Sequence, residues 1–485
     1  MLFNSWQFLL FFPIVTIAYF ILPHKFRWML LLLASCIFYM TFIPVYILIL
    51  ALTIVVDYFA GIYIEKSQGH RRKVFLTASI IANVGALAFF KYFNFLNGNM
   101  AELARLIHWN YPIGALDIIL PIGLSFHTFQ AMSYTIEVYR GKQKAERHFG
   151  IYSLYVMFYP QLVAGPIERP QNLIHQFREH HKFDYVDVTE GLKQMTWGLF
   201  KKVVIADRLA ISVNQVYANP MLYHGLPSIL ATIFFAFQIY CDFSGYSDIA
   251  LGAAKVMGFK LMQNFNKPYF SGSISEFWKR WHISLSTWFR DYLYIPLGGS
   301  RVVKWRWQFN LLIVFLLSGF WHGANWTYVV WGALNGFYLT FSVRTEKARK
   351  RFVSFIGLDG HPRTHKLIRV VITFSLICVA WVFFRAKDIQ TALYILRHFS
   401  DAFIGFPGGG WFRDSVYFLN GFGRAAYLVV FLIVAVEFAL MRYGRPINSL
   451  LQRSALIRWG IYYALGFGIL LFGVFDNSQF IYFQF

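Results

Sequence analysis

Charged residues are scarce in this sequence, and their scarcity excludes a soluble globular protein. Only 14% of the 485 residues are charged, whereas 57% are hydrophobic and 20% are aromatic. Soluble domains carry about 25% charged residues. No polar stretch is long enough to bury a core of its own. The composition therefore predicts a polytopic integral membrane protein without a soluble domain.

Cysteine and acidic residues are also few. The three cysteines, Cys36, Cys241 and Cys378, lie far apart in apolar stretches, so their spacing indicates neither a disulfide framework nor a metal site. The chain has 23 acidic residues against 45 lysines and arginines, a net charge of +22. These cations lie in short connectors between apolar runs, the pattern that orients membrane spans and contacts anionic lipid headgroups. We therefore expect membrane lipids as partners and no nucleic acid.

Apolar runs of about 17 to 25 residues are the expected membrane spans. Such runs cover residues 6–22, 28–62 with a turn at Pro44, 74–91, 115–139, 228–252, 309–320, 325–343, 370–384, 427–441 and 456–475. The first run has no basic region before it and no small-residue cleavage site after it, so we expect a retained span and not a signal peptide. With the basic connectors on the cytoplasmic side, about ten to twelve crossings are predicted.

Four other stretches are expected to behave differently. Residues 150–165 are too few to cross twice, so a re-entrant or interfacial segment is predicted. Residues 190–208 are amphipathic, and both a span and a surface helix remain open. Loops are predicted at 94–112, which is weakly charged, and at 388–424, which is rich in glycine and aromatic residues. No repeat of about 20 to 50 residues is visible, so inverted halves of the transporter type are not predicted.

One histidine, His322, falls between two apolar runs. The runs 309–320 and 325–343 are basic at their outer ends, so they predict a hairpin with His322 at or near its far turn. A hydrogen-bonded structural histidine is one interpretation. The other is a functional residue, because an ionisable group inside a membrane is costly and a neutral imidazole can take a proton from a hydroxyl group near neutral pH.

Other ionisable residues inside apolar runs have competing interpretations. Asp242 and Asp248 would form either a proton or ion pathway or structural pairs with buried basic side chains, and structural pairing is favoured because no third carboxylate joins them. His127 lies on an otherwise apolar face and is expected to be structural.

Residues 273–301 combine aromatic rings and cations unusually densely. The cations Lys279, Arg280 and Arg290 alternate with tryptophan, phenylalanine and tyrosine around His282. An amphipathic helix that anchors to lipid headgroups would have this composition. A cytoplasmic site for a phosphate-bearing or thioester donor is the alternative.

Two motifs in this part of the chain resemble the membrane-bound O-acyltransferase family. They are FWKRWHISLSTW at 277–288, continued by RDYLYIPLGG at 290–299, and GFWHG at 319–323. The resemblance extends over essentially the whole chain, including VAGPIERP at 163–170, YCDFSGYSD at 240–248 and the terminal FIYFQF. Within this family, the sequence most specifically resembles the bacterial branch that acetylates polysaccharides.

The resemblance implies an all-α, polytopic helical bundle with re-entrant or interfacial helices and a central funnel or tunnel. It implies a single domain over 1–485, with a motif core at about 120–390. Acyl groups would come from a cytoplasmic donor, by implication acetyl-CoA, and leave for an extracytoplasmic polysaccharide such as alginate. No bound cofactor is implied. A separate periplasmic acetyltransferase would finish the transfer, and the protein would lie in the bacterial cytoplasmic membrane.

The resemblance also assigns the family's essential histidine to His322 and its second characteristic polar position to His282. His322 would act as general base or acyl relay, and His282 would orient or polarise the thioester carbonyl. A further set of candidates would bind the donor or substrate, with Asp291 ordering the cations: Lys279, Arg280, Trp281, Arg290, Asp291, Trp321 and Asn325.

Two alternatives stay open at this point. A transporter without bond chemistry would use Asp242, Asp248 and His322 as a proton path. A lipid-acylating or teichoic-acid-acylating member of the same family would differ only in its acceptor.

Overall fold

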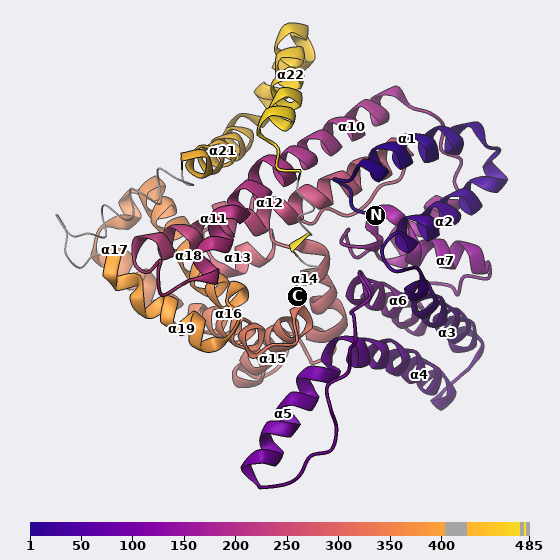
Figure 1. Ribbon diagram of the computed structural model, residues 1–485, viewed down its shortest axis with the longest axis horizontal. Coiled ribbons are helices and arrows are strands. Elements are labelled where there is room, and N and C mark those ends of the chain that lie inside the picture. The colour runs from indigo at the N-terminus through magenta and orange to yellow at the C-terminus, as the bar shows by residue number, and fades with distance from the viewer. Residues whose placement is uncertain (403–423, 476–479, 482–485) are drawn as a thin grey trace. The chain divides into compact units, whose positions relative to one another are not determined.

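The computed structural model describes the backbone of residues 1–402, 424–475 and 480–481 (Figure 1). The regular elements assigned in these ranges are all helical. Six helices in the described ranges are long and apolar enough to cross a membrane: Pro44–Lys66, His70–Leu106, Leu226–Val256, Pro362–Arg385, Tyr427–Gly444 and Ala455–Phe472. The protein is therefore an all-α, multi-pass membrane protein. The helix Trp6–Ile21 is apolar but shorter, and crossings beyond the six remain a prediction.

The chain folds into two compact units, which we describe separately. Unit 1 comprises residues 1–195 and 246–263, and unit 2 comprises residues 196–245 and 264–485. Helices α10 (Tyr185–Phe200) and α12 (Leu226–Val256) belong in part to each unit.

Unit 1 is built around three helices that share buried polar side chains. Its helices are α1 (Trp6–Ile21), α2 (His24–Met40), α3 (Ile47–Lys66), α4 (His70–Leu87), α5 (Phe93–Leu106), α6 (Leu124–Tyr139), α7 (Phe149–Met157), α8 (Tyr159–Leu162) and α9 (Pro170–Leu173). Asp57 on α3 accepts hydrogen bonds from Ser79 Oγ (2.6 Å) and Asn83 Nδ2 (2.8 Å) on α4. On α6, the predicted structural residue His127 bonds through Nε2 to Thr53 Oγ1 of α3, at 2.6 Å. These bonds tie α3, α4 and α6 together inside an apolar bundle.

Two expectations for unit 1 are corrected. The predicted loop at 94–112 is wrong over most of its length, because α4 continues through a π-helical stretch, Ala88–Tyr92, into α5. Gly98 is the one strong helix breaker in α5, and a single glycine costs a helix only about 1 kcal/mol. The predicted run 115–139 is helical only from Leu124. Pro121 and Gly123, which has a φ of +78°, precede that helix and interrupt regular structure.

Residues 150–165 form the short helices α7 and α8, whose residues are almost all buried. Neither helix is long enough to span a membrane, which agrees with the predicted re-entrant or interfacial segment. Residues 190–208 belong to one long helical stretch, in which α10 passes through a π-helical turn, Lys201–Ala206, into α11 (Asp207–Ala218). The surface-helix interpretation is wrong for the π-helical turn, because all six of its residues are buried.

Unit 2 contains the predicted hairpin, formed by α15 (Lys304–His322) and α16 (Trp326–Arg344). A Cβ atom added to Gly319 would lie 2.2 Å from the Tyr328 carbonyl oxygen, and one added to Gly332 would lie 2.3 Å from the Phe315 carbonyl oxygen. The two helices therefore touch through their backbones, which only glycine permits. Both fall outside the set of six apolar helices, because polar and aromatic residues lower their hydropathy.

The remaining α-helices in the described part of unit 2 are α13 (Ile274–Trp278), α14 (Ile283–Phe289), α17 (Glu346–Phe355), α18 (Pro362–Arg385), α19 (Ile389–Arg397), α21 (Arg424–Arg453) and α22 (Ala455–Phe472). The predicted loop at 388–424 is wrong at its start, where Asp388 caps α19 by accepting a hydrogen bond from the Thr391 amide at 2.7 Å. Residues 403–423 of that predicted loop lie outside the described residues.

Candidate functional site

His322 is the last residue of α15 and is buried, with 5% of its surface exposed. Its imidazole ring meets three aromatic rings nearly edge-on, with centroid distances of 4.9 Å to Trp321, 5.1 Å to Trp331 and 5.3 Å to Phe384. Trp331 comes from α16 and Phe384 from α18. The imidazole is thus held by rings from three helices, which restrict its rotation.

Hydrogen bonds of the Asn325 side chain stabilise the turn that follows His322. The Asn325 side chain accepts a hydrogen bond from the Thr327 amide (3.0 Å) and so caps α16. Its Nδ2 atom donates to the carbonyl oxygen of Lys387 at 3.0 Å. This predicted site residue therefore holds the end of α18 and the start of α16 in register with His322.

One aromatic core joins the two sequence motifs within unit 2. Trp281 is 1% exposed, and its ring lies 5.1 Å from Trp381 of α18. Trp381 in turn stacks at 6.0 Å on Trp331, the tryptophan that touches His322. Trp281 is therefore a core residue, and its predicted part in donor binding remains a prediction. The residues Trp331, Trp381 and Phe384 were not singled out from the sequence, because tryptophan and phenylalanine abound in all the apolar runs.

His282 occupies a strained position at the start of α14. Its φ of +42° lies in the left-handed region, which costs a residue other than glycine about 1 kcal/mol or more. The side chain is 1% exposed and meets the ring of Phe243 edge-on at 4.6 Å. Burial lowers the pKa of His282 to about 3, so its imidazole is neutral at ordinary pH.

Asn264 stabilises the backbone around His282. The Asn264 carbonyl oxygen accepts a hydrogen bond from the Ile283 amide at 2.9 Å, and Asn264 Oδ1 accepts one from Ser284 Oγ at 2.6 Å. Backbone strain of this kind persists only when surrounding contacts over-determine it, and it is found most often at functional sites.

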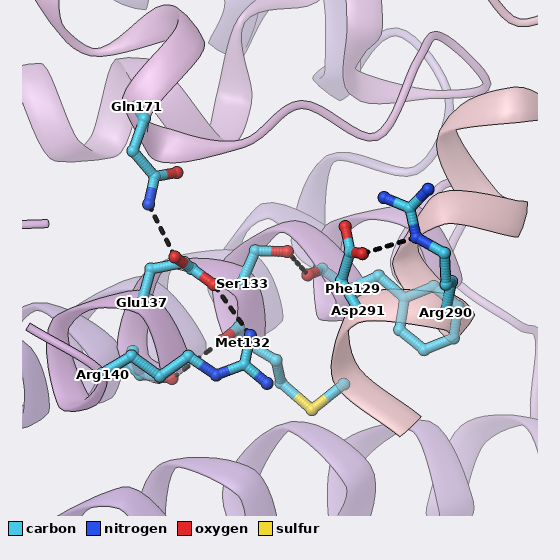
Figure 2. A network of polar contacts seen from close by, with 9 residues as sticks. Phe129, Met132, Ser133, Glu137, Arg140, Gln171, Arg290 and Asp291 are labelled. Atoms are coloured by element: carbon cyan, nitrogen blue, oxygen red, sulfur yellow. Dashed lines mark hydrogen bonds and ion pairs between the residues drawn. The ribbon is translucent and has the colours of Figure 1, made fainter. Parts of the chain in front are cut away.

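The predicted basic candidates are more exposed than the two histidines. Arg280 forms an ion pair with Glu276 at 2.6 Å. Arg290 Nε donates to Asp291 Oδ1 at 2.8 Å, as Figure 2 shows, and the part of Asp291 in ordering the cations around a donor stays a prediction. Lys279 is exposed. These side chains can reach a soluble anionic donor at the surface of unit 2.

A buried ion cluster lies beside this core, and two of its members, Lys202 and Asp207, were not singled out from the sequence. Lys202 Nζ lies 2.8 Å from Oδ1 of both Asp207 and Asp242, and all three side chains are almost fully buried. Asp242 Oδ2 accepts a hydrogen bond from the Ile481 amide at 2.7 Å. The favoured interpretation of Asp242 as a structural ion pair is therefore confirmed. Asp248 accepts a hydrogen bond from Gln194 Nε2 at 3.0 Å.

The segment at Phe480 and Ile481 packs near the His282 position. The two side chains are 1% and 2% exposed. The Phe480 ring lies 5.7 Å from Phe243, the same ring that meets His282. Three parts of unit 2 that are distant in sequence, α12, α14 and this segment, therefore converge on Phe243.

Residues 147–386, which include both histidines, match the sequence profile of MBOAT, the membrane-bound O-acyltransferase family. A probable alginate O-acetylase, AlgI, of Pseudomonas aeruginosa is 37% identical over 463 residues, covering 94% of this chain and 85% of the relative. The chain belongs to the membrane-bound O-acyltransferase family. It is therefore an O-acyltransferase, and the transporter alternative is set aside.

Two other relatives are named for different acceptors. A peptidoglycan O-acetyltransferase of Helicobacter pylori is 36% identical over 430 residues, covering 82% of this chain and 79% of the relative. A teichoic acid D-alanyltransferase of Bacillus subtilis is 29% identical over 287 residues, covering 56% of this chain and 70% of the relative. Similarity is thus more extensive to the two O-acetylating relatives.

Proposed function

We propose that this protein takes acetyl groups from acetyl-CoA on the cytoplasmic side and passes them across the membrane for O-acetylation of an extracytoplasmic polysaccharide. The observation that carries the proposal is the similarity to a probable alginate O-acetylase over 94% of the chain. The similarity to a peptidoglycan O-acetyltransferase supports an acetyl group and a polymer acceptor, and leaves the choice of polymer to experiment.

In this proposal His322 is the general base. Its imidazole takes the proton of the acceptor hydroxyl as the hydroxyl oxygen attacks the thioester carbonyl carbon. The new C–O bond forms as the C–S bond breaks, and the proton passes to the departing thiolate. Three aromatic rings hold the imidazole in place, which supports the proposal because a positioned base loses no orientation entropy at the moment of reaction.

His282 is proposed to polarise the thioester carbonyl. A neutral imidazole carries one N–H donor, and the low pKa of His282 keeps it in this neutral form. Lys279, Arg280 and Arg290 are proposed to bind the phosphates of the donor, since guanidinium and ammonium groups form charge-assisted hydrogen bonds with phosphate oxygens. A separate periplasmic acetyltransferase is proposed to supply the hydroxyl group that first accepts the acetyl group, and then to pass that acetyl group to a hydroxyl of the polymer.

The direct test compares His322→Ala with His361→Ala in cells that make the acceptor polymer. His361 is exposed and lies outside the aromatic core, so its variant controls for the loss of a histidine. We expect His322→Ala to lower the O-acetyl content of the polymer by about 100-fold or more, the usual contribution of a general base. Parental O-acetylation in His322→Ala, at normal protein abundance, would contradict the assignment.

A second experiment tests the donor and the acceptor class. Purified protein is incubated with radiolabelled acetyl-CoA, and both release of CoA and the position of the label are followed. Label on a polysaccharide or on a partner acetyltransferase supports the proposal. Label on a lipid or a teichoic acid would contradict the proposed polysaccharide acceptor. Acetylation without consumption of acetyl-CoA would contradict the proposal that acetyl-CoA is the donor.

A further inference from the structure

Unit 1 contains a cavity with a strongly basic lining, distinct from the residues proposed for acyl transfer. Its volume is about 390 Å³, and it is lined by Gly69, His70, Arg72, Lys73 and Tyr139. It lies where the connection from α3 enters α4 and where α6 ends. A volume of this size falls in the range of about 300–1,000 Å³ that is usual for small-ligand sites. We call this cavity the basic pocket.

Arg72 is held in a defined orientation in the basic pocket. One of its terminal nitrogens, Nη2, donates to the Tyr139 carbonyl oxygen at 2.7 Å, and the guanidinium carbon lies 5.2 Å from the centroid of the Tyr139 ring. A guanidinium has five N–H donors in a planar fork that matches phosphate oxygens. Tyr139 therefore orients the fork while leaving donors for a ligand. Gly69, at a φ of +56°, has nothing within 4 Å of its Cβ position, so the pocket stays open on that side.

The charge of the basic pocket is not neutralised within the described part of the chain. His70, Arg72 and Lys73 form no ion pair with any carboxylate there. The two acidic residues nearest in sequence serve other partners. Glu65 pairs with Arg147 and accepts the Ala145 amide at 2.9 Å.

The second of these acidic residues, Glu137, pairs with Arg140 at 3.1 Å and accepts a hydrogen bond from Gln171 Nε2 at 2.8 Å, as Figure 2 shows. With both carboxylates committed elsewhere, the basic pocket presents neighbouring cations without a counter-charge. Like charges held together repel one another, and a bound anion relieves that repulsion.

We propose that the basic pocket binds a phosphate ester, with Arg72 contacting two phosphate oxygens and Lys73 and His70 supplying further donors. The pocket lies in the connector at 65–73, which charge distribution predicts to be cytoplasmic, beside the membrane surface. A phosphate can reach it there from an anionic lipid headgroup or from a soluble phosphate-bearing molecule. The proposal is independent of the acyl-transfer assignment.

The test uses the purified full-length protein and two double variants. His70→Gln with Lys73→Gln replaces the imidazole and the ammonium group in the pocket by uncharged amides but keeps the bond between Arg72 and Tyr139. Lys142→Gln with Lys144→Gln removes two exposed lysines outside the pocket and is the matched control. Thermal unfolding of each ligand-free protein confirms that both variants fold.

Two probes distinguish the source of the phosphate. Retention of phosphatidylglycerol, with phosphatidylcholine as the zwitterionic reference of zero net charge, is measured by native mass spectrometry, and binding of inorganic pyrophosphate is measured by thermal shift. We expect one probe to bind the parent and the control about tenfold or more tightly than the pocket variant, since each hydrogen bond to a charged group contributes a factor of this order. Retention of the lipid alone identifies a headgroup site, and a pyrophosphate shift alone identifies a soluble ligand. Equal binding by the parent and the pocket variant, or no binding of either probe by the parent, would overturn the proposal.

Discussion

Replacing Lys202 by methionine should destabilise unit 2 strongly. The Lys202 ammonium group neutralises Asp207 and Asp242 at 2.8 Å each, in surroundings that leave only about 5% of these side chains exposed. Methionine fills a similar volume, so packing changes little. The substitution instead leaves two buried carboxylates without a counter-charge, and a buried charge without a partner is far more costly than the pair itself.

The expected cost is about 3–5 kcal/mol of unfolding free energy, the usual penalty for removing one partner of a buried ion pair. Asp242→Asn should cost less, because the ion pair of Lys202 with Asp207 remains and an amide oxygen can still accept the Ile481 N–H. A triple variant, K202M/D207N/D242N, carries no buried charge in the cluster. It should therefore recover part of the stability lost in Lys202→Met.

Equilibrium unfolding in mixed dodecyl maltoside and dodecyl sulfate micelles, followed by tryptophan fluorescence, measures these differences. Lys347→Met is the matched control, since Lys347 is exposed on α17 of unit 2 and exposed substitutions usually stay within about 0.5 kcal/mol. If Lys202→Met falls within about 1 kcal/mol of the parent, the cluster does not stabilise the fold as argued. A triple variant less stable than Lys202→Met would contradict the electrostatic explanation.

Two further predictions concern the candidate site. Gly332→Ala places a methyl group 2.3 Å from the Phe315 carbonyl oxygen, so it should cost about 1–3 kcal/mol and lower O-acetylation. Gly466→Ala in α22, with nothing within 4 Å, should not lower the melting temperature, because alanine favours a helix over glycine by about 1 kcal/mol. Equal melting temperatures of the two variants would contradict this prediction. Burial holds the pKa of His282 at about 3, below its unfolded value of about 6.5, so its contribution to stability is present above pH 6.5 and is lost as pH falls. His282→Asn should therefore show a shallower loss of melting temperature from pH 7 to pH 5, and parallel curves would refute the pKa assignment.

The hairpin around His322 illustrates what sequence patterns predict well. Two apolar runs with basic outer ends predicted helices that meet at a turn, and α15 and α16 meet at Gly323 to Asn325. The signal was local, because hydrophobicity over one helix length depends only on neighbouring residues. The glycine contacts that draw the helices together were not predicted, since each needs a backbone atom of the other helix.

Loops were predicted less well than helices. The stretches at 94–112 and 388–424 contain glycine and asparagine, which favour turns on average, yet both begin in helices. Weak local preferences are overridden by capping and packing, as Asp388 shows at the start of α19. Motif resemblance predicted the two histidines. Their aromatic surroundings come from α12, α16 and α18, and no local sequence pattern predicts how these three helices pack in space.

By itself, the sequence determined that this is a helical membrane protein, that most of its cations lie between the apolar runs, and that His282 and His322 stand in two family motifs. These properties follow from composition and from the order of residues along single helices. Only the tertiary structure decided which charges are neutralised. Lys202 forms ion pairs with Asp207 and Asp242, whereas the cations of the basic pocket form no ion pair with a carboxylate in the described chain. The reason is physical: the cost of burying a charge is local, but the partner that offsets it comes from wherever the fold brings one within about 4 Å.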